Sequence, residues 1–217
     1  MRLVVVAVAV LCASVSAASA QDQKLGAGKV EVGGFPMGGA AFIGGDDDAE
    51  VNFNLYSAGA NLTYYVNTRT AIEGELGIGF GLAQDILYRK RPVPHVQVPN
   101  VWDYFGNVVF FPGGATGRHL PYYVTAGVGA VALQSRQPTK PFGYDSDIVR
   151  FEMFTAENIG GGVKIFRVDP PDWGFRIDYR YLIVNANSDA PAFFAKATRR
   201  SGHRLTFGVL YTWKALP

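Results

Sequence analysis

The stretch WGFRIDYRY at residues 173–181 alternates strictly between two kinds of side chain. Every second residue is aromatic or aliphatic, and the residues between them are one glycine and three charged side chains. Because successive side chains of a β-strand point to opposite faces, this segment predicts a strand with one apolar face and one charged face. The pattern alone leaves open which face meets which solvent.

The same period-two alternation recurs along the chain and predicts eight strands, at residues 29–35, 56–66, 70–82, 106–111, 122–133, 156–166, 173–181 and 204–213. Most of them have the ~9 to 11 residues that a tilted strand needs to cross a bilayer. The connections alternate between short (67–69, 113–120 and 167–172) and long (36–55, 83–105, 134–155 and 182–203). This organisation predicts an all-β fold, a closed up-and-down antiparallel transmembrane β-barrel.

The glycines indicate which phase faces the barrel interior. A soluble barrel alternates in the same way, with its apolar face inward, so alternation does not distinguish the two cases. Glycine weakens a strand and adds nothing to a water-facing surface, but it fits a narrow lumen. The polar phase contains Gly77, Gly79, Gly81, Gly127, Gly129, Gly160, Gly162 and Gly208. We therefore expect the polar phase inside and the apolar phase outside.

Aromatic residues of the apolar phase gather near both ends of the predicted strands, with aliphatic residues between them. Two aromatic belts that flank an aliphatic band are typical of a lipid-facing surface, because amphipathic rings favour the headgroup level. The predicted membrane-interface aromatics are Tyr56, Tyr64, Tyr122, Trp173, Tyr179, Tyr181, Tyr211 and Trp213.

The first 20 residues have the layout of a secretory signal peptide. A basic start is followed by an apolar run too short to span a membrane and by Ala18-Ser19-Ala20, a small-residue cleavage site. We expect export with cleavage after Ala20, which leaves one barrel domain at residues 21–217. The only cysteine, Cys12, lies in the signal, so disulfides cannot hold the mature chain. The net charge of +2 gives no support for nucleic-acid binding.

The inward phase predicts a network of paired charges in the periplasmic half of the lumen. Its predicted members are Lys29, Glu31, Glu73, Glu75, Lys164, Arg176, Asp178 and Arg180. Four acids and four bases make the set neutral, and buried charges are tolerated only when they are paired. Arg204 is left out because its strand begins at the long-loop end. An eight-stranded barrel is just wide enough for side chains to fill, so we expect a closed lumen.

Several segments together resemble the OmpA-like outer-membrane β-barrel family of Gram-negative bacteria. They are the signal-like start, PYYVTAGVGAVAL (121–133), NIGGGVKIF (158–166), WGFRIDYRY and RLTFGVLYTW (204–213). The resemblance covers nearly all of the mature chain. It implies a location in the cell outer membrane, assembly by the barrel-assembly machinery, and contact with outer-membrane lipid and lipopolysaccharide. Members of this family share a fold but not one activity.

We expect a monomeric, non-enzymatic protein with a structural or surface-interaction role, without catalytic residues, cofactor or metal. Two alternatives remain open at this stage. One is a narrow passive channel for small solutes. The other is an outer-membrane enzyme that modifies lipid, for which Ser201 and His203 near the end of a long loop are the candidate residues.

Overall fold

The structure is a computed structural model, which describes residues 26–43, 51–88, 91–115, 120–138, 147–166, 172–186 and 199–214. The predicted signal peptide at residues 1–20 lies outside the described residues. No helix in the described part of the chain is long and apolar enough to span a membrane.

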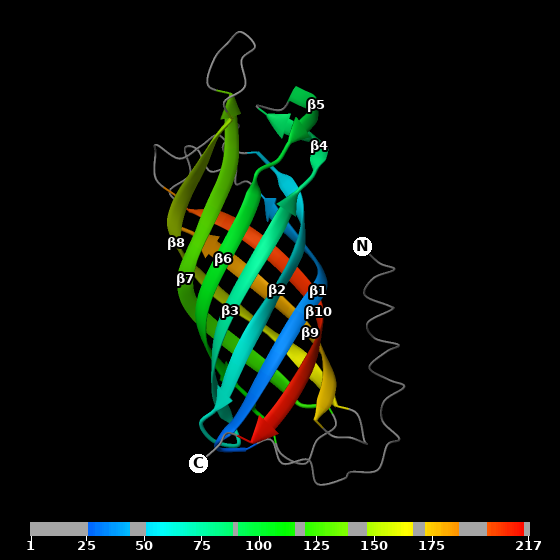
Figure 1. The fold of residues 1–217 in the computed structure, drawn as a ribbon, viewed down its shortest axis with the longest axis vertical. Coiled ribbons are helices and arrows are strands. Elements are labelled where there is room, and N and C mark those ends of the chain that lie inside the picture. Colours follow the sequence, from blue (N-terminus) through cyan, green and yellow to red (C-terminus); the bar gives the residue numbers. More distant parts are fainter. Residues whose placement is uncertain are drawn as a thin grey trace.

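Eight long strands form one closed barrel, and two short strands form a separate hairpin (Figure 1). The barrel strands are β1 (Lys29–Ile43), β2 (Phe53–Tyr65), β3 (Thr70–Gly81), β6 (Asn100–Phe110), β7 (Tyr122–Pro138), β8 (Asp147–Phe166), β9 (Trp173–Val184) and β10 (Arg200–Lys214). The hairpin consists of β4 (Ala83–Tyr88) and β5 (Arg91–Gln97). Each barrel strand pairs antiparallel with the previous and the next barrel strand, so that β3 pairs with β6. The barrel closes by the pairing of β1 with β10. The predicted fold class is therefore confirmed.

The register fixes how far the barrel strands are staggered. A path of directly paired residues runs from β10 once around the barrel and returns to β10 ten residues further along. The path is Ser201, Ile183, Glu157, Val128, Gly106, Gly74, Leu62, Val32 and Tyr211. Strands in such barrels tilt by about 35–45°, so ten residues at ~3.3 Å each correspond to a height of about 25 Å. Residues 201–211 of β10 alone therefore cover a height equal to that of the apolar band of an outer-membrane barrel.

The prediction that the first strand ends at Phe35 was wrong, because β1 continues to Ile43 through a bulge. The register of β1 shifts between Gly34 and Met37 against β10, and between Phe35 and Gly39 against β2. Pro36 lies in this irregular stretch, where its missing N–H is tolerated. Because the extra residue reverses the alternation, the two halves of β1 do not read as one strand in the sequence.

Six of the other strands also extend beyond their predicted bounds, mostly at the long-loop end, whereas β3 (Thr70–Gly81) ends one residue before its predicted bound. The fourth barrel strand begins at Asn100 and not at residue 106, and the predicted loop 83–105 contains the β4–β5 hairpin, which the sequence pattern missed. Strands β7 and β8 are the longest and project above their neighbours (Figure 1). All four long connections between barrel strands are consequently shorter than predicted, with strand ends at residues 43 and 53, 81 and 100, 138 and 147, and 184 and 200.

The two faces of the barrel wall have opposite character. Polar and charged side chains of the inward phase are buried, whereas large hydrophobic side chains on all eight barrel strands are exposed on the outer face. The glycines predicted on the inward phase do lie there. A Cβ atom at Gly162, for example, would collide with the carbonyl oxygen of Ile177 and with the ring of Tyr123.

The lumen is filled in three layers. An apolar cluster occupies the short-turn end and includes Tyr65, Phe111 and Phe166. A larger apolar cluster fills the long-loop end and includes Phe42 and Leu133. Charged side chains lie between these two clusters, so the network is in the middle of the lumen. The prediction that it is confined to the short-turn half was wrong.

Candidate functional site

The lower part of the charged layer is an ion pair enclosed by aromatic rings. Lys164 on β8 is fully buried, and its Nζ lies 2.7 Å from Oε1 of Glu31 on β1. The same Nζ donates to the hydroxyl of Tyr65 at 2.9 Å, and this hydroxyl donates to Glu31 Oε2 at 2.8 Å. Lys164 Nζ also lies 5.2 to 5.6 Å from the ring centres of Tyr65, Phe111 and Tyr123. Each polar atom of the pair thus has a partner, as a buried charge requires.

Glu73 on β3 is the centre of the network. Its carboxylate accepts hydrogen bonds from Arg176 Nη1 at 2.5 Å and from Arg180 Nη2 at 2.9 Å, both on β9 across the lumen. Thr63 Oγ1 on β2 and Asn107 Nδ2 on β6 donate to the same carboxylate, at 3.0 and 3.3 Å. Such charge-assisted, multiply bonded arrangements hold the participating strands in one geometry.

Asp178 links the two arginines of β9 to each other and to β7. It accepts from Arg176 Nη2 at 2.8 Å and from Arg180 Nε at 2.6 Å, and the hydroxyl of Tyr123 also donates to it. Arg176 and Arg180 flank Asp178 at two-residue spacing, which in a strand places all three side chains on one face. This spacing explains why the charged half of WGFRIDYRY forms a pre-paired cluster.

The upper part of the charged layer is built on Arg204 of β10. Its guanidinium bonds Asp103 Oδ1 at 2.6 Å and also bonds Glu75, while its carbon centre lies 5.6 Å from the ring centre of Phe35. Glu75 lies 3.5 Å from Arg180 Nη2 and so joins this group to the cluster around Glu73. With Thr63 and Tyr123 included, all eight barrel strands contribute to the polar layer.

The structure brings together seven of the eight residues predicted for the network. The exception is Lys29, which is half-buried at the start of β1 and forms no ion pair with any described residue. The exclusion of Arg204 was wrong, because the tilt of β10 carries this inward residue down to the middle layer. Among the described residues, the ion pairs shown join five acids (Glu31, Glu73, Glu75, Asp103 and Asp178) and four bases (Lys164, Arg176, Arg180 and Arg204), whereas the predicted set had four of each.

Sequence reasoning missed Asp103 and the two inward tyrosines. Asp103 lies in the part of β6 that the predicted strand omitted, although it alternates with outward Trp102 and Tyr104. Tyr65 and Tyr123 each follow an outward tyrosine, so the period-two rule assigns them to the lumen. The doubled tyrosines Tyr64-Tyr65 and Tyr122-Tyr123 are the sequence signal for these two lumen residues.

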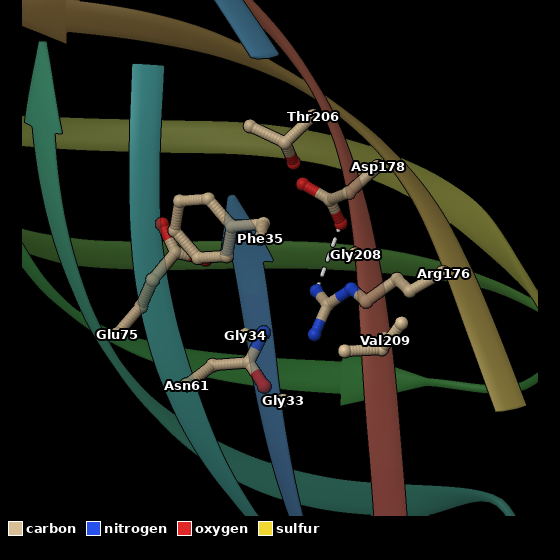
Figure 2. A pocket seen from close by; sticks show the side chains of 10 residues that line it. All are labelled: Gly33, Gly34, Phe35, Asn61, Glu75, Arg176, Asp178, Thr206, Gly208 and Val209. Atoms are coloured by element: carbon tan, nitrogen blue, oxygen red, sulfur yellow. Dashed lines mark hydrogen bonds and ion pairs between the residues drawn. The ribbon is translucent and has the colours of Figure 1, made fainter. Parts of the chain in front are cut away.

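Small cavities in the charged layer could hold single water molecules. One of about 10 Å³ is lined by Phe35, Asn61, Glu75, Arg176 and Asp178, among others (Figure 2). Figure 2 shows these side chains converging from β1, β2, β3 and β9, with the Arg176–Asp178 contact at one side. A second cavity, also of about 10 Å³, lies between residues of the upper apolar cluster and the Arg204–Asp103 ion pair. This volume is about that of one water probe, so neither cavity can hold an organic ligand.

The predicted interface aromatics all lie on the outward phase. Near the short-turn end, the rings of Trp173 and Tyr211 are 5.0 Å apart, and those of Tyr211 and Trp213 are 5.9 Å apart. Tyr64 and Tyr122 are exposed at the same end, and Tyr56 and Tyr181 face outward towards the long-loop end. Tyr179, four residues before Ile183 on β9, and the exposed Phe207 in the middle of β10 lie between the two ends, so outward aromatic side chains are not confined to two belts.

Ser201 and His203 also lie on the outer face, but each is bonded to a tyrosine of β9. Tyr181 Oη lies 2.8 Å from Ser201 Oγ, and Tyr179 Oη lies 2.7 Å from His203 Nδ1. A nucleophilic serine needs a hydrogen bond to its base. The structure shows no such bond between Ser201 and His203, although both side chains are among its described residues.

Comparison with solved structures finds the same barrel in several outer-membrane proteins. Neisserial surface protein A matches with a TM-score of 0.58 and 13% identity, over 84% of this chain and 95% of that one. OprG from Pseudomonas aeruginosa matches with a TM-score of 0.51 and 10% identity, over 90% of this chain and 100% of that one. The Ail protein of Yersinia pestis, solved with the heparin analogue sucrose octasulfate, matches with a TM-score of 0.50 and 11% identity. The match covers 86% of this chain and 99% of that one.

These similarities define the class of fold, the eight-stranded barrel of outer-membrane proteins. No model of a known protein family matches the sequence, and no curated protein matches it. The resemblance to the OmpA-like family therefore stays a prediction.

Proposed function

We propose that this chain is an integral barrel of the Gram-negative outer membrane, with a closed lumen and a structural or surface-interaction role. The observation that carries the proposal is the inverted polarity of the barrel wall. Val128, Ile159 and Phe175 are 69%, 58% and 62% exposed, whereas Glu73 and the arginines paired with it are buried. An apolar surface that surrounds the whole molecule is unfavourable in water but is required in lipid.

The first test concerns the barrel in a membrane environment. Protein folded in detergent should migrate faster on a gel when unheated than when boiled, and its circular dichroism should be dominated by strand. Recovery of the exported protein in the soluble periplasmic fraction, or a helical spectrum, would contradict the proposal. Export by the signal at residues 1–20, assembly by the barrel-assembly machinery and a monomeric state are parts of the same proposal.

A closed lumen distinguishes this proposal from a passive channel. Two apolar clusters cover the charged layer from both ends, and the cavities in that layer have the size of single waters. We therefore expect little ion conductance in planar bilayers. Steady, ion-selective conductance by the unmodified protein would instead support the channel.

A surface-interaction role is proposed for the long-loop end, where β7, β8 and the β4–β5 hairpin project beyond the barrel wall (Figure 1). The similarly folded Ail is an attachment invasion locus protein, which gives an analogy for such a role. Binding of the protein to immobilised heparin should be compared between the parent and a variant with all four long connections shortened. Loss of binding in the variant supports a role of the loops, and equal binding argues against it.

A further inference from the structure

Two neighbouring carboxyl groups on the inner face of β3 have unequal surroundings. Glu73 accepts hydrogen bonds from two arginines, a threonine and an asparagine, which together compensate its negative charge. Glu75 is two residues further along the same strand and is 7% exposed. Among the described residues it bonds one guanidinium, that of Arg204. Glu75 therefore has less compensation for a negative charge than Glu73.

The cations near Glu75 are already engaged with other carboxylates. Arg204 also bonds Asp103, at 2.6 Å, so two buried carboxyl groups share one guanidinium. Arg180 Nη2 lies 3.5 Å from Glu75, but the same nitrogen donates to Glu73 at 2.9 Å. No other described lysine or arginine forms an ion pair with Glu75 or Asp103. Ionisation of both groups leaves one negative charge without its own cation in the barrel interior, which is costly.

A buried acceptor without a donor lies opposite Glu75. Asn61 on β2 is the direct cross-strand neighbour of Glu75, and its side chain is 5% exposed. Its Oδ1 has no hydrogen-bond partner among the described residues. Both side chains line the cavity of about 10 Å³, together with Arg176 and Asp178, which are paired with each other (Figure 2). A carboxylate cannot donate to Asn61 Oδ1, whereas a protonated carboxyl group can, directly or through one water in this cavity.

We propose that Glu75 holds a proton at neutral pH, so that the upper part of the charged layer is a proton-binding site. The proton makes Glu75 a donor towards Asn61 and removes the second negative charge beside Arg204. Asp103 stays ionised, because it lies 2.6 Å from Arg204 Nη1 and lines the second cavity with Ser57, whose hydroxyl can donate. The ion pairs of the described residues then join four ionised acids and four bases. The site lies in the lumen and does not depend on the role of the loops.

Infrared spectroscopy of the folded barrel tests for this proton. The carbonyl stretching band of a protonated carboxyl group is separate from the carboxylate bands, and it shifts in heavy water. We expect the band at neutral pH in the parent protein and its loss in Glu75→Gln, because glutamine has no carboxyl group. Glu152→Gln is the control, since it changes a half-buried inward carboxyl group of β8 outside this layer and should keep the band.

The unfolding midpoint in urea gives a second readout. Glu75→Gln imitates the protonated side chain and should keep the midpoint of the parent at neutral pH. Glu73→Gln should lower it, because it removes a charge that two buried arginines share. A carboxyl group that is protonated only in the folded state stabilises that state until the folded protein releases the proton, so this stabilisation is lost as the pH rises. Raising the pH should therefore lower the midpoint of the parent more than that of Glu75→Gln.

Three results would overturn the proposal. The first is a folded parent without the band of a protonated carboxyl group. The second is a Glu75→Gln variant that fails to fold or loses as much stability as Glu73→Gln. The third is a band that persists in Glu75→Gln and disappears in Asp103→Asn, which would assign the proton to Asp103. A parent protein that does not fold as a barrel would refute the proposed function, whereas a missing band in a folded barrel leaves that function intact.

Discussion

The inner and outer faces of β9 have opposite polarity. Within twelve residues, Arg176, Asp178 and Arg180 are buried in a fully paired cluster, and Phe175 and Tyr179 are exposed on the other side. In a water-soluble protein the apolar face would be buried and the charged face exposed. The comparison shows that the environment, and not hydrophobicity alone, decides which face of a strand is the core.

The largest loss of stability is expected when Glu73, the centre of the charge network in the lumen, is removed. Glu73→Ala removes one of the two carboxylates that the buried Arg176 and Arg180 share and leaves them with Asp178 alone as a shared carboxylate. Loss of one partner from a buried charge cluster costs about 3–5 kcal/mol. Urea unfolding of the barrel in lipid vesicles gives this free energy. Glu152→Ala on β8, which removes a half-buried carboxylate outside the network, serves as the control. Equal losses for both variants would show that the network does not stabilise the barrel.

A matched pair of leucines compares the two faces without any change of charge. Leu133 lies in the upper apolar cluster and is 1% exposed, whereas Leu62 is 56% exposed on the outer face. Leu133→Ala should lower the free energy of unfolding by about 2–5 kcal/mol, because it leaves a cavity. Leu62→Ala should cost well under this, because lipid chains replace the lost contact. Similar costs in the same vesicle assay would mean that the upper lumen is not packed as described.

A charge on the outer face should be costly in proportion to its depth. Val128 is the fifth of eight steps on the tilted path from Tyr211, near the middle of the wall, and Tyr64 lies in the belt at the short-turn end. Val128→Arg should cost about 2–4 kcal/mol in bilayers, and Tyr64→Arg about 0–1 kcal/mol. Refolding equilibria of the two variants in vesicles measure the difference. Equal costs would place the membrane at another height.

The barrel and its two faces follow from local pattern, and so they could be predicted from the sequence. Alternation assigns each residue to a face, and glycines and aromatic belts indicate which face is inside. The bulge at Pro36 and the β4–β5 hairpin could not be predicted, because each interrupts or adds to the alternation without a periodic signal of its own.

The pairing within the lumen depends on strand stagger, which a single strand does not reveal. Arg204 reaches Asp103 only because the tilted strands bring β10 and β6 to the same height inside the barrel. Lys29 has the right phase but lies at the start of β1, too near the barrel end to join the middle layer. Phase was therefore predictable, whereas height was not.

The most direct test of the account asks which face of one strand meets lipid. Single cysteines are introduced on β7 at Val124 and Val128, on the outer face, and at Thr125 and Val131, on the inner face, in a chain whose only native cysteine, Cys12, is replaced. Each barrel is folded in vesicles and then treated with a small lipid-soluble thiol reagent, and the chain is unfolded afterwards to count the thiols that remain. The account predicts modification at Val124 and Val128 and little at Thr125 and Val131, because the packed lumen has no room for the reagent. Equal modification at all four positions, or the reverse order, would contradict the inside-out barrel.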